Sequence, residues 1–179
     1  MTKKYELVLD DTISFWGWKL FRIRALISFG SIEAGDLGGY IEKEDNLSHD
    51  GNAWVSGNAK VWGNAEVWGN AKVSGNAKVW GNAKVSGNAE VWGNAKVSGD
   101  AEVSGDAEVS ELGEIIVFKN HWSSGRHFTY TKSNKMWKVG CFHGTGQELI
   151  EKAYRDSEKS GNHYKAYVDF VESLEKIGN

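Results

Sequence analysis

The sequence predicts a mainly β protein: a parallel β-helix with three hexapeptides per coil, an N-terminal β cap and a small C-terminal α+β unit. The main observation is that residues 51–110 form ten consecutive hexapeptides of the pattern Gly-[Asn/Asp]-Ala-x-Val-[Ser/Trp], with no insertion. A less regular six-residue spacing precedes them at 39–50, and alternating and then helical patterns follow them. A fixed short period of this kind is typical of a repeat architecture whose stacked units share one core.

The segment before the repeats is expected to cap one end of the β-helix, with its boundary at residues 1–38. The stretch 19–26 (KLFRIRAL) alternates as a strand does, and 27–39 is typical of a strand followed by a glycine-rich turn. A bare end would expose valines and an unpaired strand edge, so the architecture requires a cap.

Two irregular hexads lie between this cap and the regular repeats. They are 39–44 (GYIEKE) and 45–50 (DNLSHD), and they predict degenerate first rungs. In this alignment Ile41 and Leu47 occupy the alanine position. His49 occupies the valine position, where we expect a partly buried histidine at the end of the core.

Each regular hexapeptide predicts a short strand followed by a tight corner. Ala and Val are two residues apart, so an extended backbone points both to the same side, while the variable residue and the final Ser or Trp point outward. Gly-Asn or Gly-Asp supplies the corner, because both residues tolerate positive φ. Three such sides close a coil of 18 residues. An α-helix would be broken by these corners, and a hairpin array would need a second turn sequence.

This arrangement resembles the left-handed parallel β-helix of the hexapeptide-repeat family, with Val at the aliphatic inward position and Ala at the small inward corner. The run FRIRAL…GSIEAGDLGGYIEKEDNLSHDGNAWV is similar to an N-terminal segment of hexapeptide-repeat proteins of bacteriophages, prophages and some bacterial genomes. Those proteins are labelled transferase-like or polymer-forming through the repeat. The resemblance covers about residues 5–110, and it implies the fold and a mobile-element origin.

Counting by one coil of 18 residues shows which outward side chains share a face. The first face carries Lys60, Lys78 and Lys96 beside Trp62 and Trp80; the second carries Glu66, Lys84 and Glu102 beside Trp68; the third carries Trp54, Lys72, Glu90 and Glu108 beside Trp92. The alternating charges of the second face predict ion pairs between neighbouring rungs.

The first face is the predicted contact surface. Its three stacked lysines repel one another and favour an anionic partner, and its two tryptophans are expected to lie exposed about one strand spacing apart. Alternatives are that the rings only cover backbone and lysine stems, or that the strip binds a sugar or single-stranded nucleic acid. The predicted contact residues are Trp62, Trp80, Lys60, Lys78 and Lys96, with Trp68, Trp92 and Trp54 near the edges.

The chain after the repeats predicts a separate α+β unit at 117–179, which leaves 39–116 to the β-helix. Three segments (EIIVFKNHW, RHFTYT and KMWKVGCF) are expected to form a three-strand meander. Thr145 and Glu148 form a capping box that begins a helix reaching to about Lys159. Gly161 and Asn162 are expected to break it, and a second helix follows with an apolar stripe, made of Tyr164, Tyr167, Val168, Val171 and Leu174.

The sequence offers little support for catalysis. Acyltransferases of the resembled fold use a histidine base and an extended loop, and its carbonic anhydrases hold a metal with three histidines, but residues 51–110 contain no histidine and no inserted loop. A zinc site made of Cys141, His143, His121 and His127 is conceivable, although ordinary sheet and loop positions explain these residues too. We therefore expect no catalytic residue, cofactor or metal.

Composition and charge restrict the partners. The 179 residues carry 21 basic and 24 acidic side chains, a net charge of −3, so direct binding to nucleic acid is not expected. One cysteine fits a reducing compartment, and the N-terminus shows no signal-peptide core and the chain no membrane-spanning run, so we expect a soluble cytoplasmic protein.

The function that follows from the sequence is a non-catalytic, phage-derived binding protein acting in the host cytoplasm. Its partner is expected to be a host protein or complex, with inhibition of a defence nuclease or CRISPR effector as the concrete form, and the chain is also expected to form a homo-oligomer. The alternatives are a hexapeptide acyltransferase-like enzyme, favoured by a groove with a histidine, and a self-assembling scaffold, favoured by an open end of the β-helix.

Overall fold

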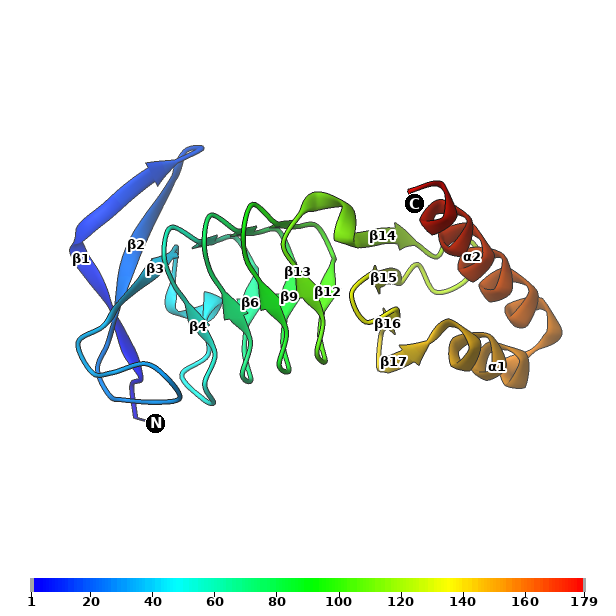
Figure 1. Ribbon diagram of the computed structural model, residues 1–179, viewed down its shortest axis with the longest axis horizontal. Coiled ribbons are helices and arrows are strands. Elements are labelled where there is room, and N and C mark those ends of the chain that lie inside the picture. The colour runs from blue at the N-terminus through cyan, green and yellow to red at the C-terminus, as the bar shows by residue number, and fades with distance from the viewer. Residues whose placement is uncertain (1, 179) are drawn as a thin grey trace.

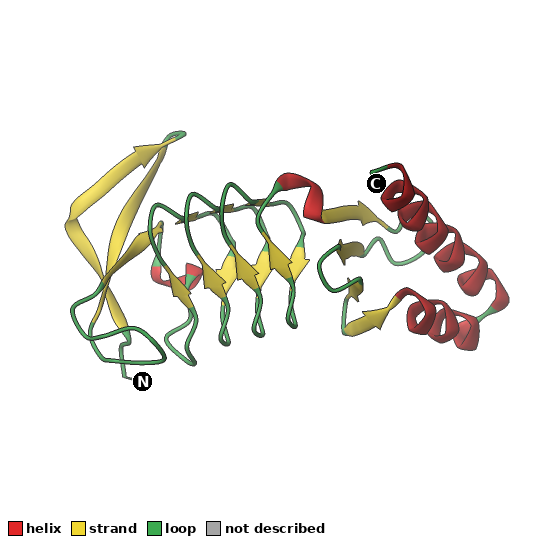
Figure 2. Ribbon diagram, viewed as in Figure 1, coloured by secondary structure: helices red, strands yellow, loops and turns green. Residues whose placement is uncertain are grey.

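A computed structural model describes residues 2–178 and shows three parts in a row (Figure 1). A strand-rich N-terminal region leads into a parallel β-solenoid, and a unit with two helices follows it (Figure 2). The predicted fold class is therefore confirmed, while the left-handed sense of the coil stays a prediction. Across the described residues, neither helix has the length and apolar character needed to cross a bilayer.

The N-terminal region is a long hairpin joined to the solenoid by a third strand. Strands β1 (Tyr5–Phe15) and β2 (Trp18–Ala25) are antiparallel, and the turn between them places Trp16 and Gly17 at φ 50° and 82°. Strand β3 (Leu37–Ile41) pairs antiparallel with β2 and parallel with the first strand of one solenoid face. The strand predicted at 19–26 is confirmed, but β1 was not expected from the sequence.

The solenoid consists of two-residue strands, one per hexapeptide, arranged on three faces. The first face contains β5 (Lys60–Val61), β8 (Lys78–Val79) and β11 (Lys96–Val97); the second contains β6 (Glu66–Val67), β9 (Lys84–Val85) and β12 (Glu102–Val103); the third contains β4 (Trp54–Val55), β7 (Lys72–Val73), β10 (Glu90–Val91) and β13 (Glu108–Val109).

The core of the solenoid is the column of alanines and valines predicted from the repeat. Val61, Val79 and Val97 lie in register on neighbouring strands, which confirms the 18-residue coil. Every alanine and valine of the ten hexapeptides is buried. A fully buried valine stabilises the fold by about 1.5–3 kcal/mol, so this column is the main source of stability.

The corner residues stack as closely as the core. The corner glycines have positive φ, and a Cβ on Gly87 would lie 2.9 Å from the backbone nitrogen of Gly105 in the next coil, so no larger residue fits. Beside them the asparagine amides form ladders, as in the donation from Asn70 to Asn88 (3.1 Å) and from Asn88 to Asp106 (3.2 Å). The last members of the two ladders that end at Asp100 and Asp106 only accept, so these positions need no amide donor.

The register of the first rungs differs from the prediction. Ile41 pairs with Val61 and Leu47 bridges to Val67, so both occupy the valine position and not the alanine position. The physical reason is that Gly39 takes the alanine position, where a Cβ would lie 2.7 Å from the carbonyl oxygen of Ala59. His49 is partly buried as expected, with its ring stacked on Tyr5 at 4.3 Å, but it does not occupy the predicted valine position, which Leu47 takes in that rung.

The N-terminal end of the solenoid is closed by hydrogen-bond donors. Each coil directs its carbonyl groups toward the preceding coil, so the first coil leaves acceptors without a strand to pair with. Lys4 Nζ donates to the carbonyl oxygens of Ala53 (2.8 Å) and Gly51 (3.3 Å). Asn46, in the 3-10 turn η1 (Glu44–Asn46), donates from Nδ2 to the carbonyl oxygen of Ala65 (2.8 Å).

The C-terminal end is closed by acceptors, because the last coil leaves N–H groups unpaired. The Thr129 hydroxyl accepts from the backbone N–H of Glu102 (2.9 Å), and the Ser133 hydroxyl accepts from that of Glu108 (2.8 Å). A second 3-10 turn, η2 (Leu112–Glu114), connects the last coil to the C-terminal unit. The two caps therefore have opposite hydrogen-bonding character.

The C-terminal unit contains one strand more than predicted. Its sheet is an antiparallel meander of β14 (Ile115–Lys119), β15 (His127–Thr131), β16 (Met136–Val139) and β17 (Phe142–Thr145). The third predicted segment is divided because Gly140, at φ 55°, makes a tight turn. Helix α1 (Gly146–Asp156) follows, and it begins with the predicted capping box between Thr145 and Glu148.

The break between the helices lies earlier than predicted. Helix α2 (Glu158–Ile177) begins after Ser157, whose hydroxyl accepts from the backbone N–H of Ser160. Gly161 lies inside α2, where the Tyr154 ring of α1 packs against it and a Cβ would lie 2.1 Å from that ring. Glycine is therefore needed here for close helix packing, and the prediction of a break at this residue is wrong.

Candidate binding surfaces

The first face aligns its lysines and tryptophans as the repeat predicts. Lys60, Lys78 and Lys96 lie in register on β5, β8 and β11. The rings of Trp62 and Trp80 stack with their centroids 5.2 Å apart and their planes 5° from parallel. This separation is close to one strand spacing, so the predicted vertical alignment is confirmed.

The predicted exposure of this stack is wrong for Trp62, and Trp80 is half-buried. Trp62 is only 2% exposed, because the tip of the β1–β2 hairpin folds over it. The Phe15 ring meets Trp62 edge to face at 5.4 Å, and Leu20 and Tyr40 belong to the same cluster. Part of the first face is therefore an internal contact between cap and solenoid.

The exposed aromatic residue at this place is Trp16, which sequence reasoning missed. Its side chain is 67% exposed, and its ring stacks on Phe15 at 4.8 Å and lies edge-on to Trp62 and Trp80 at 6.1 and 6.3 Å. Trp18, across the turn, is also exposed. Two residues ending in glycine between two alternating segments can indicate a hairpin turn, but the usual pairs are Asn-Gly and Asp-Gly. The pair Trp16-Gly17 does not match this pattern, so the turn was not predicted.

The lysines of the first face lie against the hairpin to different degrees. Lys60 Nζ and Lys78 Nζ lie 5.2 and 5.3 Å from the centroid of the Phe15 ring, a cation–π geometry. Burial lowers the pKa of Lys60, and the positive charge of Lys78 lowers it further. Lys96 lies one coil beyond and is exposed. Of the ion pairs within residues 2–178, none includes these three lysines.

Charge pairing between rungs occurs on a different face from the one predicted. Glu66 and Lys84 of the second face make no ion pair within the described chain. The rung-to-rung pair lies on the third face, where Lys72 Nζ is 3.1 Å from Glu90 Oε1. On the second face, Trp68 is 36% exposed and lies apart from the hairpin cluster.

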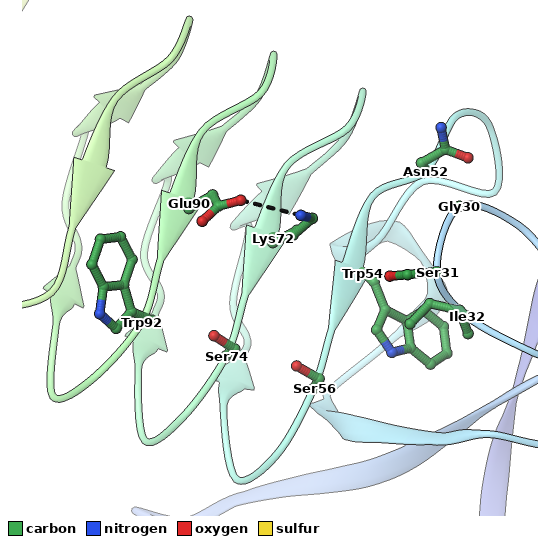
Figure 3. Close-up of a pocket in the computed structure, with 10 residues that line it drawn as sticks. All are labelled: Gly30, Ser31, Ile32, Asn52, Trp54, Ser56, Lys72, Ser74, Glu90 and Trp92. Atoms are coloured by element: carbon green, nitrogen blue, oxygen red, sulfur yellow. Dashed lines mark hydrogen bonds and ion pairs between the residues drawn. The ribbon is translucent and has the colours of Figure 1, made fainter. Parts of the chain in front are cut away.

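The third face carries a groove of about 310 Å³. Trp54 is only 4% exposed and is held edge-on by Phe29 at 5.4 Å and Tyr5 at 6.3 Å, so it forms a fixed wall. Trp92 lies at the other end, and Ser56 and Ser74, which occupy the same repeat position as Trp92 in the two preceding coils, lie between the two rings (Figure 3). The lining residues are Gly30, Ser31, Ile32, Asn52, Trp54, Ser56, Lys72, Ser74, Glu90 and Trp92.

The histidines and the cysteine of the C-terminal unit do not form the conceivable zinc site. His127 Nε2 lies 3.6 Å from Asp100 Oδ2, and the His143 ring packs over Gly105, so both contact the last coil of the solenoid. His121 Nδ1 instead hydrogen-bonds to the Tyr167 hydroxyl at 2.8 Å. Within residues 2–178 no three His, Cys, Asp or Glu side chains are placed to share a metal ion.

Comparisons with known proteins give no relative from which a function could be transferred. A scan against protein-family models finds no match for this chain, and a search of curated proteins finds none either. Two surfaces of the molecule are therefore the candidates for function: the hairpin tip over the first face and the groove of the third face.

Proposed function

We propose that this protein is a non-catalytic binding protein that contacts a protein partner through the tip of the β1–β2 hairpin. The contact area, here called the hairpin-tip surface, combines exposed aromatic rings with lysines that have no acidic neighbour in an ion pair. Its members are the exposed Trp16 and Trp18, the half-buried Phe15 and Trp80 beneath them, and the lysines Lys78 and Lys96.

The observation that carries this proposal is the state of Trp16. Its ring is the most exposed tryptophan side chain of the described residues, yet it is fixed by the Phe15 ring and by the stack beneath it. Its φ of 50° is unfavourable for a bulky residue, and backbone strain of this kind concentrates at functional sites. A rigid exposed tryptophan loses little entropy on docking, and tryptophan is enriched among interface hot spots.

The partner class comes from charge and from the resemblance. Lys78 and Lys96 favour an acidic surface on the partner, since complementary charge speeds and orients association. The similarity to bacteriophage proteins supports a host protein, and a defence nuclease or CRISPR effector is the target class that we propose. A second copy of this chain is the other expected partner, and the same experiment separates the two.

The substitution Trp16→Asn tests the proposal, because Asn tolerates positive φ while the ring is removed. Immobilised protein is used to retain partners from an extract of a CRISPR-carrying bacterium, and each retained protein is identified and purified. Calorimetry then compares its Kd for the wild type and the variant. We expect binding to weaken by about tenfold or more, since a hot-spot tryptophan contributes about 2 kcal/mol or more.

Trp68→Ser is the matched control, because it removes an exposed tryptophan of the second face and introduces a residue that the repeat already uses. It should bind the partner as the wild type does. Equal affinity of Trp16→Asn and wild type for every retained protein contradicts the proposal. Sedimentation of the same variants shows whether a second copy is bound: a dimer that only Trp16→Asn loses identifies self-association at this surface.

The two alternative functions have different structural requirements. An end-to-end scaffold needs open ends, whereas Lys4 and Asn46 cover one end and Thr129 and Ser133 the other. An acyltransferase of the resembled fold needs a histidine in a groove, and the third-face groove, as described within residues 2–178, is lined by ten residues without one. A specific observation, the position of Trp16, favours protein binding.

A further inference from the structure

We propose that the groove on the third face is a binding site for a neutral saccharide, a ligand distinct from the protein partner proposed above. The groove lies over β4, β7 and β10, about 310 Å³ in volume, and the loop at 30–32 closes one end (Figure 3). Sites for small molecules have volumes of about 300–1,000 Å³, so the groove suits a monosaccharide or a disaccharide.

A row of hydroxyl groups lies between the two tryptophans of the groove. Ser56 and Ser74 occupy the same position of consecutive coils, so their side chains repeat at about 4.8 Å, the strand spacing. Alternate equatorial hydroxyls of a pyranose ring have a comparable separation. Within the described chain, no side-chain hydrogen bond uses either serine hydroxyl, so both can donate to and accept from a ligand.

The charge of the groove favours a neutral ligand. Its charged side chains are Lys72 and Glu90, which already pair at 3.1 Å and together contribute no net charge. A phosphate or carboxylate ligand would compete with this pair and would lie close to the Glu90 carboxylate. A neutral polyhydroxylated ligand can instead hydrogen-bond to both partners while the ion pair stays intact, and such charge-assisted bonds are the stronger ones.

Two tryptophans form aromatic walls of the groove. Trp54 and Trp92 lie at opposite ends of the hydroxyl row, as Figure 3 shows. A sugar ring has C–H faces and a hydroxyl rim, and the electron-rich face of an indole attracts C–H groups. The groove thus offers apolar surface and hydroxyl partners in the arrangement that a sugar requires.

The floor of the groove is preformed. The backbone N–H of Ser56 donates to the carbonyl oxygen of Val73 (2.9 Å), and that of Ser74 donates to the carbonyl oxygen of Val91 (2.8 Å), so both serines, which directly follow strands, are bonded to the next coil. Trp54 is fixed by its neighbours Phe29 and Tyr5. A preorganised site loses little conformational entropy on binding, which favours affinity for a small ligand.

The test uses saturation-transfer NMR and calorimetry with maltose, cellobiose and chitobiose as neutral probes. Glucose and glucuronic acid form a further pair that differs in charge. We expect at least one neutral disaccharide to bind with a Kd of about 1 mM or lower, and Trp92→Ser to weaken it by about tenfold. Trp92→Ser introduces a residue that the repeat already uses, and its fold is checked by circular dichroism melting.

Trp68→Ser is the matched control, since it makes the same change at an exposed tryptophan outside the groove, and it should bind like the wild type. Trp16→Asn should also leave saccharide binding unchanged, which separates this site from the hairpin-tip surface. The absence of saturation transfer to every neutral probe overturns the proposal. So does equal binding by Trp92→Ser and wild type, or tighter binding of glucuronic acid than of glucose.

Discussion

Trp62 and Trp80 on the first face occupy the same repeat position of neighbouring coils, whereas Trp54 and Trp92 on the third face occupy different repeat positions of coils that are two apart. The first pair stacks at 5.2 Å and leaves no space between its rings. The second pair leaves two serines on the floor between them, and a groove results. In a solenoid, the repeat positions of two aromatic residues and the number of coils between them therefore decide whether they become part of the packing or the walls of a site.

The N-terminal cap adds a second difference between these faces. On the first face the hairpin tip covers Trp62 and presents Trp16 in its place. On the third face the loop near Phe29 packs on Trp54 and beside Asn52, and the groove extends from there to Trp92. The cap thus determines which outward tryptophans contribute to stability and which are available for binding.

The largest expected effect is in the core that supports both faces. Val79→Asp should unfold the solenoid, because an unpaired carboxylate in an apolar core costs several kcal/mol or more. The exposed control Lys84→Ser should change the free energy of unfolding by less than about 0.5 kcal/mol. Thermal melting followed by circular dichroism measures both, and equal melting temperatures would show that the valine column is not the core.

A smaller effect distinguishes the covered first face from the open surface. Trp62→Ser should lower the free energy of unfolding by about 3–5 kcal/mol, since it removes a buried ring and leaves a cavity under the hairpin. Trp68→Ser makes the same change at an exposed site and should lower it by less than about 1 kcal/mol. Urea unfolding measures both values. Similar losses for the two variants would mean that the hairpin does not cover Trp62 in solution.

A pH effect sharpens the comparison, because each face has a lysine shielded from water near its N-terminal edge. Burial lowers the pKa of Lys4, below the third face, from 10.5 to about 8, and it lowers that of Lys60 on the first. Between pH 8 and pH 10.5, Lys4 therefore binds its proton more tightly in the unfolded chain than in the folded protein. The free energy of unfolding should rise by about 2 kcal/mol from pH 8 to pH 10 through Lys4.

Urea unfolding at these two pH values checks this prediction, with Lys4→Met as the control that cannot titrate. Measurements stop at pH 10 because burial raises the pKa of Tyr5 in the folded protein. Above the ordinary tyrosine pKa of 10.0, Tyr5 ionises more readily in the unfolded chain, which lowers the free energy of unfolding. A rise of equal size in Lys4→Met would assign the effect to other groups.

The smallest expected change in stability comes from a substitution that gives the third face a stacked tryptophan pair like that of the first face. Ser74 lies one coil before Trp92 in the same repeat position, so Ser74→Trp should create a stacked pair like that of Trp62 and Trp80. An aromatic pair stabilises by about 0.5–1.5 kcal/mol, so melting should occur at an equal or slightly higher temperature. Saccharide binding should be lost because the new ring fills the groove. Calorimetry with a neutral disaccharide that binds the wild type decides this, and retained binding would contradict the proposed position of the ligand.

The solenoid could be predicted because its information is local. The inward positions of Val79 and Ala77, the 18-residue register and the alignment of Lys60 with Lys78 all follow from one repeated hexapeptide. The capping box at Thr145 was also local and correct.

The features that the sequence did not reveal depend on contacts between different secondary-structure elements. Phe15 and Trp16 cover Trp62, although more than forty residues separate them. Gly161 lies inside a helix because the ring of Tyr154 packs on it, a tertiary contact that outweighs its weak helix propensity. The groove likewise depends on where the loop at 30–32 lies, which no periodic pattern specifies.

Because its two caps are complementary, the solenoid can change in length and so set the distance between the hairpin and the helical unit. Donors close the N-terminal end and acceptors close the C-terminal end, and every coil between them is interchangeable with its neighbour in register. Inserting or deleting 18 residues in the middle of the repeat would keep both caps intact and move the hairpin relative to the helical unit by about 4.8 Å. Sequence change can thus alter the distance between two attached modules in fixed steps without altering either module.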